Sequence, residues 1–342
     1  MQSNIDRLIV GVDVSKHNLD VAFWQGEKSI FLDKFTNNYD GFQNVVKHIQ
    51  KQISEINVQP HSVFVVMEPT GGYEQPFAIF AISYGWEVSL PNPQQLRNWI
   101  KGIGKRVKTD RQDALMLAMY GAVQNPPTWN PLPEVISQLE SLLKRLDDFK
   151  DILRQEENRL QSWETKSNKH YIAEESIKES IAFLNHQIKQ IDEAIKRHYD
   201  EHPGLKQEKN NLQKVSGVGN KISSYLLVEM HRWKVLTNGK GNTKGIVAYL
   251  GLDPKHYVSG TSVHKRSSIS RQGNNVIRHL LYMGALGGVR GNNPLKDFYQ
   301  RLVGRGKPKK VALIAAARKI VVWCWTVFIK GEAFDPTLCY AH

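Results

Sequence analysis

The chain has 342 residues, of which 41% are hydrophobic and 23% are charged, which is enough apolar material for a buried core and excludes a disordered chain. Lys and Arg number 46 against 33 Asp and Glu, and the resulting net charge of +13 favours a polyanionic partner such as nucleic acid. Two cysteines, Cys324 and Cys339, exclude a disulfide framework and a cysteine-rich zinc site, and fit a reducing cytoplasm.

The first 120 residues alternate strand and helix patterns. Short apolar runs between turn residues predict strands, and apolar residues at helical spacing predict helices. In chain order we expect strands at Leu8 to Val14, Leu19 to Trp24 and Ser29 to Thr36, a helix at Gly41 to Ile53, a central strand at Val63 to Met67, a helix at Gln75 to Tyr84, a strand at Trp86 to Leu90, and a helix from about Thr109 to Tyr120. This is the element order of a ribonuclease-H-like α/β fold, predicted for residues 1–125.

A second region begins after two proline clusters, Asn125 to Pro127 and Asn130 to Pro133, which mark a domain boundary. Residues 134–203 are predicted to form a coiled coil or helical hairpin that reverses at the polar stretch Lys166 to His170. Its two apolar seams follow heptad spacing at Leu139, Leu142, Leu146, Phe149, Leu153 and Leu160, and at Ile177, Ile181, Leu184, Ile188, Ile191 and Ile195. The pattern leaves open whether this is an intramolecular helical pair or a dimerisation arm.

The third region, residues 211–342, is predicted to be a mainly helical, Gly-rich and basic domain. A basic cluster, Arg305, Lys307, Lys309 and Lys310, precedes its last apolar helix. That helix, Val311 to Ile329, is interrupted by Arg318 and Lys319, so we expect it to be buried rather than to cross a membrane. The polar residues Met1 to Asp6 do not resemble a signal peptide.

Four carboxylates occur at positions that bring them together in this fold. Asp13 and Glu68 end the first and fourth strands, which are neighbours in a ribonuclease-H-like sheet, and Asp110 and Asp113 share one face at the start of a helix. Each has an ordinary alternative, a turn residue at a strand end or an acid that complements the helix dipole. Converging oxygen ligands would repel one another without a divalent cation, so the quartet predicts a Mg²⁺ site suited to phosphodiester chemistry.

A second segment combines glycine, hydroxyl and basic side chains between Leu250 and Gly273. It offers serines at 259, 262, 267, 268 and 270, among which its pattern does not choose. Backbone amides, hydroxyls and charges of this kind bind a phosphate backbone, and an ordinary solvated loop is the alternative. The predicted nucleic-acid contacts here are Lys255, His256, Lys265, Arg266 and Arg271, together with Lys307, Lys309 and Lys310 of the later basic cluster.

A short turn, Val215 to Gly219, resembles a helix-hairpin-helix turn. Small residues such as Gly217 and Gly219 allow backbone amides to approach a phosphate, so both are candidate nucleic-acid contacts. A plain tight turn between helices is the alternative. The aromatic residues Tyr249, Tyr257, Trp323 and Trp325 are expected in the core, and stacking on bases is the alternative.

The acids and the segments around them are similar to those of a known family. Asp13, Glu68 with its Pro-Thr-Gly-Gly-Tyr tail, and the stretch Lys108 to Ala114 resemble the DEDD motif of the RuvC-like insertion-sequence transposases that include the Piv-type DNA invertases. The resemblance extends over nearly the whole chain. It implies that the four acids bind metal at the catalytic centre and that Ser259, in the Tyr-x-Ser-Gly segment, is the nucleophile that links covalently to DNA.

The resemblance also implies a homodimer or homotetramer, donor and target DNA as substrates, and a structured noncoding guide RNA. We therefore predict a cytoplasmic DNA transposase or site-specific recombinase that acts at the nucleoid. An alternative is a metal-dependent invertase or junction-resolving nuclease in which Ser259 only contacts phosphate. A non-catalytic nucleic-acid-binding protein is an alternative from another class, and four intact acids argue against it.

Overall fold

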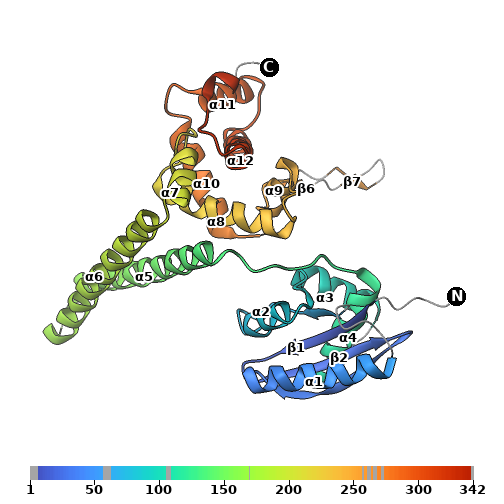
Figure 1. The fold of residues 1–342 in the computed structure, drawn as a ribbon. Helices are drawn as coiled ribbons and strands as arrows, with labels where there is room; N and C mark the ends of the chain where they lie inside the picture. Colours follow the sequence, from blue (N-terminus) through green and yellow to red (C-terminus); the bar gives the residue numbers. More distant parts are fainter. Residues whose placement is uncertain are drawn as a thin grey trace. The chain divides into compact units, whose positions relative to one another are not determined.

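The computed structural model describes residues 7–56, 63–104, 109–168, 170–255, 258–259, 263–264, 268–270 and 273–339. The chain divides into two compact units, Met1–Pro131 and Leu132–His342 (Figure 1). The first is α/β and the second is mainly helical, which confirms the predicted fold class. Residues 134–203 and 211–342, predicted as separate domains, lie within one of these units.

The N-terminal unit contains a five-stranded sheet in the order β3-β2-β1-β4-β5. Its strands are β1 (Leu8–Val14), β2 (Asn18–Gln25), β3 (Lys28–Thr36), β4 (Val63–Met67) and β5 (Glu87–Ser89). The first three form the predicted antiparallel meander, whereas β4 is parallel to both β1 and β5. This is the ribonuclease-H-like topology, and it makes β1 and β4 neighbours with the same direction.

Helices cover both faces of this sheet. They are α1 (Tyr39–Ile56), α2 (Gln75–Ser83), α3 (Pro93–Gly102) and α4 (Asp110–Gln124). Alternate side chains of β4 belong to two separate cores: Val65 packs in the core that holds α1 and α2, and Phe64 packs with α3 and α4. The strand is therefore buried on both faces, as its unbroken apolar sequence predicts.

The second unit begins with a long helical hairpin of α5 (Glu134–Glu164) and α6 (Tyr171–Glu201), which we call the arm (Figure 1). The remaining helices are α7 (Pro203–Gln213), α8 (Asn220–Leu236), α9 (Thr243–Tyr249), α10 (Asn275–Gly288), α11 (Pro294–Gly304), α12 (Lys309–Lys330) and the 3₁₀ turn η1 (Pro336–Cys339). Between α9 and α10 lie four short strands, β6 (Pro254–Lys255), β7 (Val258–Ser259), β8 (Val263–His264) and β9 (Ser268–Ile269).

One hydrophobic core joins the base of the arm to these C-terminal helices. Leu139 and Leu146 of α5 belong to the same core as Leu226 of α8 and Ile320 of α12. Helix α12 is long and apolar enough to cross a membrane, but 56% of its apolar window is buried inside the unit. It is thus the buried helix that the sequence predicts, and Trp323 and Trp325 are core residues, as expected.

Candidate active site

The position of α4 over the sheet is set by close backbone contact at a glycine. A Cβ atom on Gly11 of β1 would lie 2.2 Å from the backbone nitrogen of Ala118 in α4. Gly121, later in the helix, leaves similar room for Val66 of β4, whose Cγ2 atom would be 2.7 Å from an added Cβ. Because only glycine permits these approaches, α4 lies directly across β1 and β4 and its first turn reaches the edge of the sheet.

Asp13 and Glu68 lie side by side at that edge. Val12 of β1 pairs with Met67 of β4 in parallel register, and each acid directly follows one of these partners. Asp13 also pairs with Asp20 of β2, which is buried. The sheet therefore brings the first two predicted acids together, as the neighbouring strands require.

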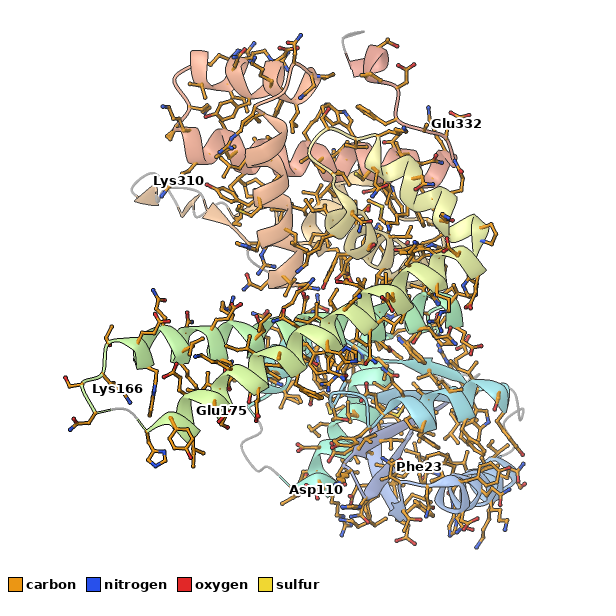
Figure 2. All side chains as sticks on the ribbon, turned by 90° about the vertical axis from the view of Figure 1, so that its left-hand side faces the viewer. Phe23, Asp110, Lys166, Glu175, Lys310 and Glu332 are labelled. Carbon is orange, nitrogen blue, oxygen red and sulfur yellow. The ribbon has the colours of Figure 1, made fainter. Side chains whose placement is uncertain are left out.

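The first turn of α4 supplies the other two acids. Thr109 caps the helix by accepting a hydrogen bond from the backbone nitrogen of Gln112 at 3.2 Å. Asp110 and Asp113 follow in the first turn, and Figure 2 labels Asp110 at this end of the helix. Burial raises the pKa of Asp13 to about 6, and the charges of Asp113, Asp110, Asp20 and Glu68 raise it as well. The other three predicted acids thus lie close enough to Asp13 to act on it electrostatically.

Two basic side chains lie among these acids, and the sequence analysis did not predict either. The Lys34 ammonium is 3.4 Å from Asp20 Oδ2 and 3.9 Å from Asp110 Oδ2. The Arg97 guanidinium on α3 is 3.3 Å from Glu68 Oε1. Over the described residues, no three Asp, Glu, His or Cys side chains form a ready metal site. The donor set is nevertheless all oxygen and carries the like-charge repulsion that a divalent cation relieves, so it fits Mg²⁺ chemically.

Two further residues fix the loops that follow Asp13 and Glu68. Glu74, which is only 4% exposed, accepts hydrogen bonds from the backbone nitrogens of Thr70 and Gly72 at 3.0 and 2.9 Å. Asn37 donates to the carbonyl oxygens of Ser15 and Tyr73 at 2.9 and 3.1 Å, and so joins the loop after β1 to the loop after β4. The Pro-Thr-Gly-Gly-Tyr-Glu spacing was the available signal for Glu74, whereas nothing local singles out Asn37.

Ser259 lies in the other unit, on β7. Its backbone pairs with Val263 of β8, while Pro254 of β6 pairs with Ile269 of β9, so both pairs are antiparallel and nest one inside the other. We call these four strands the serine ribbon. Figure 1 shows β6 beside α9 and β7 farther from the helices. The side chains of Lys255 and Ser259, and the whole of His256, Tyr257, Lys265, Arg266 and Arg271, lie outside the described residues.

Part of the predicted basic surface adjoins the base of the serine ribbon. Lys307, Lys309 and Lys310 are exposed at the start of α12. A groove runs between this helix and the ribbon base, and Figure 2 shows Lys310 beside the short strands. The groove is lined by Leu252, Pro254, Ile269, Lys310, Val311, Ile314, Ala315 and Arg318. Cationic groups therefore lie next to the segment that carries Ser259.

Gly217 of the Val215 to Gly219 turn has a clear packing role, whereas an added Cβ on Gly219 would meet nothing within 4 Å. An added Cβ on Gly217 would be 2.5 Å from the carbonyl oxygen of Gly284 in α10, and Gly217 has a φ of +87°. The turn is thus a tight connection packed against α10. For Gly217 this agrees with the alternative of a plain tight turn between helices. Contact of Gly217 and Gly219 with nucleic acid stays a prediction.

Comparison with known proteins agrees with this arrangement of two units. A family model described as Transposase matches residues 10–163, and the model of the Transposase IS116/IS110/IS902 family matches residues 209–300. The pilin gene-inverting proteins of Moraxella lacunata and Moraxella bovis are each 31% identical over 98% of this chain and 99% of the relative. The chain belongs to this transposase family. Members are DNA recombinases, so the alternative of a non-catalytic binding protein is set aside.

Among solved structures, T. thermophilus RuvC in complex with Holliday junction substrate matches with 13% identity and a TM-score of 0.25. The match covers 34% of this chain and 92% of the RuvC chain. For this IS116/IS110/IS902 transposase, the fold assignment rests on its own strand order and register.

Proposed function

We propose that this transposase cuts and rejoins DNA with a metal-binding site formed by Asp13, Glu68, Asp110 and Asp113 and with Ser259 as the nucleophile. The observation that carries the proposal is the convergence of four negative charges on one half-buried carboxylate, Asp13. An acid cluster of this kind destabilises the fold unless a ligand of opposite charge uses it, and sites that do so are functional-site candidates.

The four acids would hold Mg²⁺ after their side chains turn towards one another, because the described side chains do not yet form a complete site. Lys34 and Arg97, which lie beside Asp110 and Glu68, would then be free to face a DNA phosphate. Bound Mg²⁺ would supply electrostatic stabilisation of the charge that develops on phosphate oxygens.

Ser259 would act by transesterification. Its hydroxyl oxygen attacks a DNA phosphorus and loses its proton to a base, the bond from phosphorus to one sugar oxygen breaks, and that DNA end leaves as a sugar hydroxyl. A sugar hydroxyl of another strand then attacks the serine phosphodiester and releases Ser259. No bond energy is lost, because each step exchanges one phosphodiester for another.

The partners follow from the same proposal. Donor and target DNA would contact the basic groups at the start of α12 and along the serine ribbon, in the cytoplasm at the nucleoid. We further propose a structured noncoding guide RNA, which the net charge of +13 would attract as well as DNA. A homodimer or homotetramer would form through the arm, whose outer half exposes Ile152 and Phe183.

Inversion of a DNA segment is the second candidate reaction. The two Moraxella relatives, matched over nearly their whole length, are named for inverting a pilin gene. Inversion and transposition use the same cutting and joining chemistry and differ in the arrangement of the DNA sites. A substrate plasmid with two sites in inverted orientation, scored beside a donor and target pair, distinguishes them.

The test uses one variant in each half of the proposed site. Asp13→Asn should abolish strand exchange and leave DNA affinity near normal, because an amide is a poorer Mg²⁺ ligand. Ser259→Ala should prevent a covalent adduct on denaturing gels while DNA affinity persists, and EDTA should stop exchange by the unmodified protein. Exchange by Asp13→Asn would contradict the metal site. An adduct formed by Ser259→Ala would contradict the nucleophile, and Ser262 would be tested next.

Because the acids and Ser259 belong to different compact units, the two variants also test how the site is assembled. Recovery of exchange on mixing Asp13→Asn with Ser259→Ala would mean that one subunit supplies the acids and another supplies the serine. Failure of the mixture, with both proteins oligomeric, would place all five residues of a working site in one chain.

A further inference from the structure

A buried acid on α8 contacts both ends of the segment that carries Ser259. Glu229 is 7% exposed. Its Oε2 atom accepts a hydrogen bond from the Tyr249 hydroxyl at 2.9 Å, and its Oε1 atom accepts one from Asn274 Nδ2 at 2.9 Å. Tyr249 is the last residue of α9, and Asn274 is the N-cap of α10. Residues 250–273, which include Ser259, connect these two helices, so both ends of this segment are held by the carboxylate of Glu229. We call these three residues the Glu229 bridge.

Further contacts continue from the bridge towards the serine ribbon. An added Cβ on Gly273 would lie 2.3 Å from the carbonyl oxygen of Tyr249, so the two ends of the segment touch through their backbones. The backbone nitrogen of Ser270 donates to the carbonyl oxygen of Asp253 at 2.9 Å, and their side chains are also hydrogen-bonded. The pairing of β6 with β9 begins at the next residue, Pro254.

Each member of the bridge is held in place by a separate contact. The Tyr249 ring stacks on Trp233, with ring centroids 5.4 Å apart. Asn274 Oδ1 accepts from the backbone nitrogen of Val276 at 2.9 Å as the cap of α10. The Arg232 guanidinium offsets the charge of Glu229 at 3.9 Å and pairs with Glu140 of the arm at 2.5 Å. A buried carboxylate with two donors and a nearby cation is fully satisfied.

We infer that Glu229 is a positioning residue for strand exchange: by holding Tyr249 and Asn274 together it fixes the base of the serine ribbon and thereby the position of Ser259. The inference rests on the proposed role of Ser259. A two-residue ladder such as β6 with β9 has too few hydrogen bonds to define its own position, so the fixed point has to lie in the helical body. Loss of that fixed point slows a reaction that depends on placement of the nucleophile.

The decisive variant is Asn274→Asp. Aspartate is as good a helix cap as asparagine, so α10 keeps its cap, but the donor that faces Glu229 becomes a second carboxylate. We expect strand exchange to slow at least tenfold and hydrogen exchange of the Ser270 amide to quicken at least tenfold, while DNA affinity changes less than threefold. Asn242→Asp, the same change at the exposed cap of α9, is the matched control and should alter neither rate.

The double variant Glu229→Gln with Asn274→Asp tests the pairing itself. The glutamine amide then donates a hydrogen bond to the new carboxylate at position 274, and the glutamine carbonyl accepts one from the Tyr249 hydroxyl. Both hydrogen bonds are thus restored, and only the one between positions 229 and 274 has its donor and acceptor exchanged. Exchange rate and Ser270 protection should recover to within threefold of the unmodified protein. The inference would be overturned if Asn274→Asp changed neither rate, or if the double variant recovered protection of the Ser270 amide without recovering strand exchange.

The experiments distinguish a wrong assignment of Ser259 as the nucleophile from a wrong role for Glu229. If Ser259→Ala still forms the adduct, the nucleophile is misassigned, and protection of the Ser270 amide still reports whether Glu229 fixes the ribbon. If Ser259→Ala loses the adduct but Ser270 protection ignores Asn274→Asp, the nucleophile stands and the Glu229 bridge is refuted.

Discussion

The carboxylate of Asp13 is destabilised in the folded, metal-free chain by its burial and by four neighbouring acids, which together raise its pKa from 3.8 to about 6. In the unfolded chain the same group titrates near its ordinary value. Between about pH 4 and pH 6 the folded protein therefore retains a proton that the unfolded protein has lost. It follows that the free energy of unfolding falls as pH rises through this window and stays lower above it.

We predict that Asp13→Asn stabilises the metal-free protein above pH 6. Allowing for solvent around this half-buried group, the gain in the free energy of unfolding should be about 1 kcal/mol. Urea unfolding at pH 5 and pH 7.5 measures it. Added Mg²⁺ should stabilise the unmodified protein at pH 7.5 and have little effect on the variant. A variant less stable than the unmodified protein at pH 7.5 would contradict the account of acid repulsion.

At this scale the sequence predicts the acids better than the residues that support them. Strand ends and helix spacing locate Asp13, Glu68, Asp110 and Asp113 because those signals are local. Lys34 and Asn37 act across the sheet, on groups far away in the sequence, so no local pattern marks them. The roles of the four acids and of Ser259 stay predictions until the variants are measured.

The close approach of α4 to β1 is the feature that carries two acids to the other two. We predict that Gly11→Ala destabilises the protein by about 2 to 3 kcal/mol, because a methyl group would overlap the backbone of α4 at Ala118 and force the helix away. Strand exchange should fall with it. The control is Gly102→Ala at the end of α3, where an added Cβ meets nothing within 4 Å. Thermal unfolding of both variants measures the difference.

We expect the base of the arm to stabilise the fold and its outer half to contribute to assembly. Leu146, near its base, is 5% exposed and belongs to the main core, so Leu146→Ala should cost about 2 to 5 kcal/mol. Phe183, farther out on α6, is 60% exposed, so Phe183→Glu should change stability by less than about 0.5 kcal/mol. We expect Phe183→Glu with Ile152→Glu to reduce the oligomer measured by light scattering. An unchanged oligomer would mean that this surface is not an assembly contact.

The elements themselves differ in how far sequence determines them. β1 and β4 begin and end at the predicted residues because most of β1 and all of β4 are buried, which gives each strand a clear apolar run. The apolar pattern does not predict helix α3, because only Leu96 of its residues is fully buried, although Asn92 and Pro93 form a good cap and first turn. The sequence does not predict the strands of the serine ribbon, since ladders of two residues leave no periodicity to detect.

At the scale of the whole molecule, the two parts of the proposed site carry opposite charges: acids in the N-terminal unit and basic groups in the C-terminal unit. In the proposed site the acids of the N-terminal unit would need a cation, whereas the C-terminal unit presents basic groups, and the net charge of +13 shows that the basic groups dominate. DNA would be attracted mainly by the second unit and reach the acids only with metal bound. Binding and cutting should therefore respond differently to Mg²⁺ and to monovalent salt.

We predict that DNA affinity falls steeply with monovalent salt and that Lys307, Lys309 and Lys310 account for part of the slope. Each neutralised phosphate contributes roughly −0.9 to a plot of log affinity against log salt on duplex DNA, so changing one of these lysines to Gln should reduce the slope by about that amount. Lys178→Gln, which removes the same charge from the arm where Lys178 pairs with Glu174 at 2.6 Å, should leave the slope unchanged. Fluorescence anisotropy of protein and duplex DNA across a salt series, without added Mg²⁺, measures all four variants. Equal slopes for the α12 lysine variants and the arm variant would show that the start of α12 is not where the phosphate backbone binds.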